Sequence, residues 1–404
     1  MKKDIARALA AATCSLLGSA TLAPLQAQEE PNWDFNTALL YYGEGDSRVQ
    51  DVSLNILARR TLSDDRFLSL GLAVDSLTGA TPSGALPMPV AQTFTSPSGD
   101  ANYTVPAGEY PLDNTFHDTR WALTAAWQQP LGRLYNGNAG MSFSKEYDYT
   151  HFGANFGLSR DFNKRNTTLS LGLAISKDDI EPVGGAPIPL SSMLPVGDRS
   201  NKLGNDSKDV IDILLGITQV INERLVLQAN YSFSDTSGYL NDPYKILSVV
   251  DPVNGDSIAL PGGGAGPSHA YRFESRPDSR GKRSLYGQAK YYMGGKVLDL
   301  SYRYMTDDWG VDSHTLDGHL RIPLGDRAYI EPHLRFYTQT EADFYRASLS
   351  AGEPLPLHAA SDYRLGNFEA ITAGLKYGWK TGSGQDVPSG LNITSKMAKS
   401  PPVR

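Results

Sequence analysis

The strongest constraint on the fold is an alternation of apolar and polar residues that recurs along most of the chain. In residues 68–75, leucine or valine occupies every second position, and serine, glycine, alanine or aspartate occupies the positions between them. Successive side chains of a β-strand point to opposite faces, so this pattern predicts a strand with one apolar face and one small or polar face. The pattern recurs in residues 167–176 and 225–234. We therefore expect an all-β protein.

Applied to the whole chain, the pattern predicts about fourteen strands. Each has about ten residues, the length with which a tilted strand crosses a bilayer. The expected strands lie near residues 33–43, 48–60, 66–76, 117–128, 135–144, 149–160, 167–176, 208–220, 225–234, 283–292, 297–306, 313–322, 328–338 and 367–379.

The connections between these strands are sorted by length. The connection after every even-numbered strand is short, and all the long segments follow odd-numbered strands, near 77–116, 177–207, 235–282 and 339–366. Short periplasmic turns that alternate with long extracellular loops are typical of outer-membrane barrels, whereas a soluble sandwich gives no reason for such sorting. The sequence thus predicts a closed antiparallel transmembrane β-barrel, with an even strand count that places both chain ends on the periplasmic side.

The first 27 residues have the pattern of a cleaved export signal. Lys2, Lys3 and Arg7 precede an apolar run, and a small-residue site ends at Ala27. A membrane anchor is the alternative, although the run contains polar residues and is barely long enough to span a bilayer. Cleavage removes three basic groups, one acidic group and Cys14, the only cysteine, so the net charge changes from -7 to -9.

We accordingly expect three parts: a signal peptide over 1–27, the barrel over 28–380, and a disordered periplasmic tail over 381–404. No run of 18 apolar residues follows the signal, so membrane-spanning helices are not expected. The expected location is the bacterial outer membrane, in contact with lipopolysaccharide and inserted by the barrel-assembly machinery, for which Tyr377 and Trp379 in the last strand would serve as a signal. The negative charge argues against nucleic acid as a partner.

Several stretches resemble one bacterial family. Residues 302–315, with the sequence YRYMTDDWGVDSHT, are similar to a signature of the family catalogued as domain of unknown function 3570, and further similar stretches are 75–84, 276–280, 335–339 and 363–366. The resemblance implies an outer-membrane barrel without an assigned activity. It also implies that the gene lies near genes for periplasmic thioredoxin-like and flavin-transfer proteins. The protein is therefore expected to have a periplasmic redox or metal-handling partner.

Charged residues gather at the expected inward positions of three adjacent strands. Such a wall is interpreted first as a structural lining of ion pairs, second as a filter that selects solutes by charge, and third as a catalytic or metal-binding site. Its members are Asp299, Arg303, Asp317, His319, Arg321, Glu331, His333 and Arg335.

A second group of candidates lies at the rim. Carboxylates and an imidazole around one short external turn would converge as metal ligands or as an acid–base pair, or else remain solvated and bridge divalent cations to lipopolysaccharide. Basic and acidic residues at the end of the longest loop are expected to fold that loop onto the rim. The two sets are Asp307, Asp308, Trp309, Ser313 and His314, and Arg276, Asp278 and Arg280.

Two local features complete these expectations. The loop over 77–116 is long enough to fold into the mouth as a constriction. Pro332 falls inside an expected central strand and cannot donate a ladder hydrogen bond, so a bulge or an early strand start is expected there.

The function expected from the sequence is a channel for small hydrophilic solutes or ions. A non-conducting envelope scaffold for a periplasmic redox or metal-handling partner is the first alternative. A membrane-embedded hydrolase is the second, and it lacks a convincing nucleophile and base in the sequence. No enzymatic activity and no cofactor are expected, and the sequence leaves a metal undecided.

Overall fold

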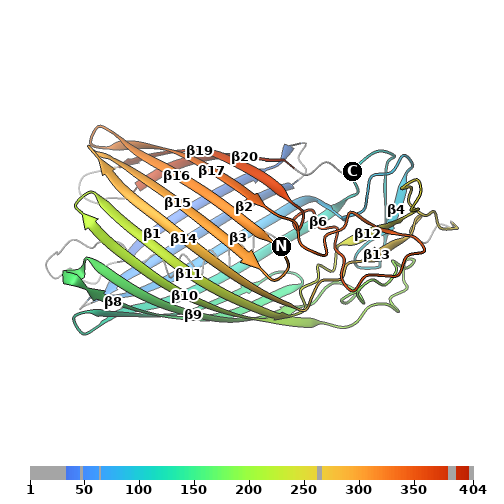
Figure 1. Cartoon of the computed structure of the whole chain (residues 1–404), viewed down its shortest axis with the longest axis horizontal. Helices are drawn as coiled ribbons and strands as arrows, with labels where there is room; N and C mark the ends of the chain where they lie inside the picture. The colour runs from blue at the N-terminus through green and yellow to red at the C-terminus, as the bar shows by residue number, and fades with distance from the viewer. Residues whose placement is uncertain (1–32, 46–48, 63–64, 262–265, 381–387, 400–404) are drawn as a thin grey trace.

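The computed structural model describes residues 33–45, 49–62, 65–261, 266–380 and 388–399. The expected signal peptide lies outside the described residues. One large antiparallel sheet of fifteen strands dominates the fold, and its strands run at an angle to the long axis of the molecule (Figure 1). Along the sheet these strands are β1 (Trp33–Gly43), β2 (Val49–Leu62), β3 (Arg66–Pro82), β6 (Leu112–Leu131), β7 (Tyr135–Lys145), β8 (Tyr149–Phe162), β9 (Thr167–Ile180), β10 (Asp206–Asn222), β11 (Leu225–Gly238), β14 (Ser279–Met293), β15 (Lys296–Asp307), β16 (Asp312–Leu324), β17 (Ala328–Gln339), β19 (Phe368–Lys380) and β20 (Pro388–Lys399).

All fourteen expected strands are present, and each pairs with its neighbours along the sheet. The fifteenth strand corrects the expected disorder of the tail: β20 pairs with β19 from Pro388↔Lys380 to Lys399↔Glu369. The missed signal is the alternation in residues 391–397, where Leu391, Ile393 and Met397 alternate with polar residues. With β20 the large sheet has fifteen described strands, whereas an even number was expected.

The two faces of the large sheet differ in the way the sequence predicts. In β9, Leu171 and Ile175 are 50% and 48% exposed, whereas Ala174 and Asp178, at positions of the opposite parity, are buried. We call the face with the large exposed side chains the apolar face and the opposite one the polar face. A water-soluble sheet would bury its large apolar side chains, so this arrangement is inverted with respect to a soluble protein.

The long segments do not remain irregular. They contain β4 (Gln92–Thr95), which pairs with β5 (Asn102–Val105), and a second small sheet made of β12 (Ile246–Val250), β13 (Tyr271–Phe273) and β18 (Ser348–Ser350). Figure 1 shows β4, β12 and β13 together beyond one end of the large sheet. We call the described residues of 83–111, 181–205, 239–278 and 340–367 the cap.

The cap contains a conventional hydrophobic core. Phe94, Met193, Ile246 and Tyr271 come from three different cap segments and are all buried in one cluster. The rings of Phe94 and Tyr271 lie 4.7 Å apart between centroids. Burial of side chains of this size contributes roughly 1.5 to 3 kcal/mol each, which helps to hold the segments together.

The expected constriction loop over 77–116 is corrected by this packing. Its ends extend β3 to Pro82 and start β6 at Leu112, and its middle forms the β4–β5 hairpin of the cap. The physical reason is Phe94, which is fully buried in the cap core and would lose that burial in a water-filled mouth.

Pro332 lies within β17 and produces no bulge. The ladder with β16 stops at His319↔His333 and resumes at Ile322↔Ile330 in the same register. The missing N–H of proline therefore leaves a local gap in the ladder, and the expectation of a bulge or early strand start is wrong.

The described residues include one short 3-10 helix, η2 (Asn163–Arg165), in the turn between β8 and β9. Among the helical residues described, none belongs to a helix long and apolar enough to cross a membrane.

Candidate functional site

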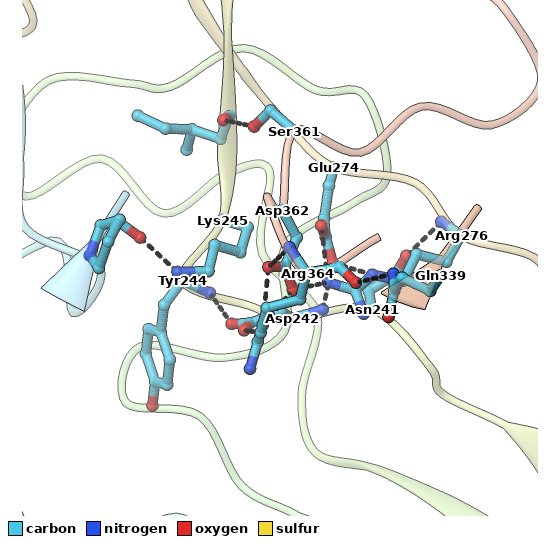
Figure 2. Close-up of polar contacts among 12 residues, drawn as sticks. Asn241, Asp242, Tyr244, Lys245, Glu274, Arg276, Gln339, Ser361, Asp362 and Arg364 are labelled. Atoms are coloured by element: carbon cyan, nitrogen blue, oxygen red, sulfur yellow. Dashed lines mark hydrogen bonds and ion pairs between the residues drawn. The ribbon is translucent and has the colours of Figure 1, made fainter. Parts of the chain in front are cut away.

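Six ionisable side chains, four of them buried and the other two largely so, lie where the cap meets the large sheet. Figure 2 shows them converging from three connections: between β11 and β12, between β13 and β14, and between β18 and β19. Of the six, the sequence analysis singled out Arg276. It missed the other five because they sit in irregular segments without a recognisable pattern. The cap cluster, as we name it, consists of Asp242, Lys245, Glu274, Arg276, Asp362 and Arg364.

Two arginines connect the cap cluster. Arg364 Nε lies 2.6 Å from a carboxylate oxygen of Asp362, and Arg364 Nη2 donates to Asp242 Oδ2 at 2.8 Å. Arg276 Nη2 donates to Glu274 Oε2 at 3.0 Å and to Asp362 Oδ2 at 3.1 Å. The planar guanidinium fork suits such bridging between carboxylates. Each arginine therefore joins two connections of the cap.

The cap cluster is also joined to the large sheet itself. Lys245 Nζ donates to the backbone carbonyl of Pro82 at the end of β3. On the other side, Gln339 at the end of β17 donates to the carbonyls of Arg364 and Gly366, at 2.9 and 2.8 Å. The cap is thus held to strands from distant parts of the sheet.

Burial sets the protonation of the cap cluster. It raises the pKa of Glu274 to about 7, against the opposing effect of the Arg276 charge and with a further increase from Asp242. Burial also acts to raise the pKa of Asp242, but the charges of Lys245, Arg364 and Arg276 outweigh it and hold that pKa below its ordinary value. The raised pKa of Glu274 makes this carboxyl group one that titrates near neutral pH.

The turn between β15 and β16 is fixed by Asp307. Its Oδ2 accepts from Arg280 Nε at 2.8 Å, and its Oδ1 accepts the backbone N–H groups of Trp309 and Val311 at 3.0 and 2.9 Å. The Arg280 guanidinium lies 4.3 Å from the Trp309 ring centroid. The Trp309 ring is buried edge-on against Phe344 of the cap. Asp307 and Trp309 thus anchor the turn to the cap.

The other rim candidates do not join this anchor. Asp308 Oδ2 accepts the N–H of Gly281 at 2.9 Å in an exposed position. Asp278 is exposed, and its carbonyl accepts the N–H of Gly238. Ser313 is buried on the polar face, whereas His314 is exposed on the apolar face, where Tyr302 Oη lies 2.7 Å from its Nδ1.

The expected convergence of Asp307 and His314 is therefore absent from this turn. Neighbouring residues of a strand point to opposite faces, and the register places His314 with Tyr302 on the apolar face while Asp307 pairs with Arg280. The structure brings no metal site or acid–base pair together from the described residues of this turn.

A hydroxyl, an imidazole and a carboxylate form a chain on the polar face of β7, β8 and β9, which the sequence analysis missed. Ser142 Oγ lies 3.0 Å from His151 Nε2, and His151 Nδ1 lies 2.6 Å from Asp178 Oδ1. This is the order of groups in a hydrolase triad. Their polar-face positions on three consecutive strands are the signal that would have found them.

The surroundings of Ser142 favour a structural role for this chain. Ser142 is paired on both sides, with Thr124 of β6 and Gly153 of β8. Backbone N–H groups in such a ladder are already bonded, so they do not form the oxyanion hole that acyl transfer requires. Asp178 also accepts from Tyr149 Oη and lies 3.5 Å from Lys208 Nζ, which makes it the centre of a polar network near the end of β9.

The expected charged wall lies on β15, β16 and β17. Asp299 is 3.4 Å from Lys290 on β14, Arg303 lies over the Tyr286 ring at 5.5 Å, and Arg321 lies over the Tyr329 ring at 3.8 Å. These three side chains are therefore engaged at separate points along the wall. Arg335 stands opposite Asp317 in the ladder and is exposed.

Four members of the wall do come together. His319 Nε2 lies 3.0 Å from Asp317 Oδ1, His333 Nε2 lies 2.9 Å from Asp317 Oδ2, and His319 Nδ1 lies 3.6 Å from Glu331 Oε1. The two imidazole rings stack at 4.0 Å with an interplanar angle of 5°.

Two groups among the described residues have metal-ligating atoms within 4.8 Å of one another. One is Asp317, His319 and His333 of the wall. The other is an acidic trio at the rim, Asp118, Glu146 and Asp148, in which Asp148 accepts from Tyr244 of the cap.

The fold and these clusters define the class: an all-β protein built on one large antiparallel sheet, with a charged polar face and a folded cap at one end. The family described as "Protein of unknown function (DUF3570)" matches residues 6–399, and the chain belongs to that family. The sequence resemblance is thereby confirmed. A search of curated proteins found no match.

The solved structures that match the chain include an import receptor and a siderophore receptor. The ferric-catecholate import receptor Fiu from E. coli K12 matches with 10% identity and a TM-score of 0.45 over 92% of this chain and 62% of its own length. The siderophore receptor PirA from Acinetobacter baumannii matches with 10% identity and a TM-score of 0.42 over 93% of this chain and 54% of its own. The chain thus spans less than two thirds of the length of these receptors.

Proposed function

We propose that the large sheet closes into a β-barrel in the bacterial outer membrane, and that the barrel is a capped channel for small hydrophilic solutes or ions. The observation that carries this proposal is the inverted sheet, with large apolar side chains exposed and small or polar ones sheltered. In water such a surface is unfavourable by roughly 25 cal/mol for each Å² of apolar area, whereas the hydrocarbon of a bilayer accommodates it.

The hydrogen bonds of Ile246 support closure. Its N–H donates to Ser83, which directly follows β3, and its carbonyl accepts from Ser361, seven residues before β19. These strands are third and fourteenth in the sheet, which is roughly 50 Å apart if the sheet were flat. Seven residues of chain reach at most roughly 25 Å. The sheet must therefore curl strongly, as a barrel requires.

In the closed barrel the polar face lines the lumen. The side chains of its charged wall are partly exposed rather than packed solid, which suits a water-filled interior. Rows of acidic and basic side chains along a lumen select solutes by charge. The cap then lies over the extracellular mouth and limits access to it.

The same cap favours the second candidate, a non-conducting barrel that serves as an envelope scaffold for a periplasmic partner. Its hydrophobic core and its buried cap cluster hold the segments over the mouth in one arrangement. A barrel that is closed permanently in this way would present its short turns to the periplasm.

Conductance separates the two candidates. Folded protein in planar bilayers is expected to conduct ions, and the variant Asp362→Ala, which breaks the cap cluster, is expected to conduct more or to open more often. The matched control is Asp308→Ala, an exposed carboxylate outside the cap cluster. If wild type and Asp362→Ala both insert but neither conducts, the channel proposal fails and the scaffold is favoured.

A further inference from the structure

We propose that Asp317, His319 and His333 form a binding site for a divalent transition-metal ion on the polar face of the large sheet. The three residues lie on the paired strands β16 and β17, with His319 directly opposite His333 and Asp317 two residues before His319. Their positions are therefore set by the ladder and not by a loop. Sites built on strands hold their ligands more rigidly than sites on loops.

The ligand set suits transition metals. Two imidazoles and one carboxylate are the ligands that proteins use for Zn²⁺, Fe²⁺ and related ions, often with an open position for water. Each carboxylate oxygen of Asp317 faces the Nε2 atom of one imidazole, at 3.0 and 2.9 Å. Neighbouring ligand atoms around a four-coordinate zinc ion are separated by a similar distance, roughly 3 to 3.5 Å. Small side-chain movements are thus sufficient to bind an ion.

Glu331 supplies the outer support that metal-bound histidines usually have. Its Oε1 lies 3.6 Å from His319 Nδ1, on the far side of the ring from Asp317. A proton on Nδ1 would point at this carboxylate and leave the Nε2 lone pair free for a metal. This carboxylate–histidine–metal order is common in metal sites, because it fixes the tautomer and the ring orientation.

The neighbouring cations and the exposure of the site are compatible with an ion. Arg321 lies over Tyr329 and Lys290 lies beside Asp299, so both have partners away from Asp317. The side chains of Asp317, His319 and His333 are 21%, 37% and 19% exposed, which leaves room for a water molecule as a further ligand. Arg335 stands opposite Asp317 in the ladder and is exposed.

The first test is binding of Zn²⁺ to folded full-length protein in detergent, after removal of metal with a chelator. Wild type is expected to bind one tight equivalent by equilibrium dialysis with elemental analysis, and His333→Gln to bind at least about tenfold more weakly, since the loss of even an outer partner of a ligand costs that much. The matched control is His314→Gln, which removes an imidazole from the apolar face of the same strand β16 and is expected to bind as wild type does. Equal binding by His333→Gln, or the absence of a stoichiometric site in wild type, would overturn the proposal.

The second test needs no variant and therefore survives a folding defect in His333→Gln. Cu²⁺ bound to wild-type protein at one equivalent is expected to give an electron paramagnetic resonance spectrum with nitrogen couplings from two imidazoles. Couplings from one nitrogen or none contradict the proposed ligand set. Both tests measure binding alone, so their outcome does not depend on whether the barrel conducts.

Discussion

Removal of Asp362 is expected to loosen the cap without unfolding the large sheet. This carboxylate is buried, and it accepts from Arg364 Nε at 2.6 Å and from Arg276 Nη2 at 3.1 Å. Removing one member of a buried ion pair costs about 3 to 5 kcal/mol, because the remaining charge stays buried. Arg364 keeps Asp242 at 2.8 Å and Arg276 keeps Glu274 at 3.0 Å, so the lower end applies and Asp362→Ala is expected to cost about 3 kcal/mol of cap stability.

Hydrogen exchange of backbone amides measures this loss where it occurs. The N–H groups of Ile246 and Phe273 bond to Ser83 and Ser191 across different cap segments, and they exchange only when the cap opens. A loss of about 3 kcal/mol accelerates their exchange by roughly a hundredfold, since each 1.4 kcal/mol is about a factor of ten. Amides in the middle of β9 are expected to keep their wild-type rates.

A double variant provides the control for charge balance. Asp362→Ala leaves three cationic and two acidic members in the cap cluster, whereas Asp362→Ala with Arg364→Ala leaves two of each. The double variant is therefore expected to be clearly less destabilised than the sum of its single variants. Unchanged exchange of the Ile246 amide in Asp362→Ala would refute the reasoning, because it would mean that the cap cluster does not hold the cap.

Three further predictions concern other parts of the chain. Because the pKa of Glu274 is raised to about 7, its contribution to cap stability is fully present below its ordinary pKa of 4.5 and is lost as the pH rises through 7; once the base-catalysed intrinsic exchange rate is divided out, the protection of cap amides should therefore fall between pH 5 and 8 in wild type but not in Glu274→Gln, and the same fall in that variant would exclude Glu274. Leu171→Lys on the apolar face of β9 is expected to cost about 2 to 4 kcal/mol of folding stability in lipid, and Ser170→Lys on the polar face much less, as measured by chemical unfolding in vesicles; equal costs would contradict the assignment of faces. A fluorophosphonate probe is expected to leave the protein unlabelled, and labelling that disappears in Ser142→Ala would show that Ser142 is a nucleophile after all.

The strands were predictable because the alternation of apolar and polar residues is a local property of the sequence. Alternation in one strand, such as residues 167–176, needs no knowledge of any partner, and the turns between strands contain residues that end the pattern. The observed strand β9 only extends this segment, to Ile180. The strand β20 was missed because its alternating stretch is short and follows a polar segment.

The cap and its cluster were not predictable from the sequence. Asp242, Glu274 and Asp362 are separated by up to 120 residues, and each sits in an irregular segment where charge normally indicates exposure. Their burial depends on contacts between three connections that are distant in the sequence, which no local pattern encodes. The charged wall was predicted in part. The alternation placed Asp317, His319 and His333 on one face, but only the register of β16 and β17 brings the two imidazoles together.

The central claim, that the apolar face meets lipid and the polar face meets water, is tested most directly by single cysteines along β9. In a Cys14→Ser background, each residue from Leu169 to Ser176 is replaced in turn, and the folded protein in vesicles is treated with a membrane-impermeant thiol reagent. We expect reaction at even-numbered positions such as Ser170 and protection at odd-numbered ones such as Leu171, in a strict period of two. Reaction at both sets of positions would contradict the account, as would a chain that stays folded in water without lipid or detergent.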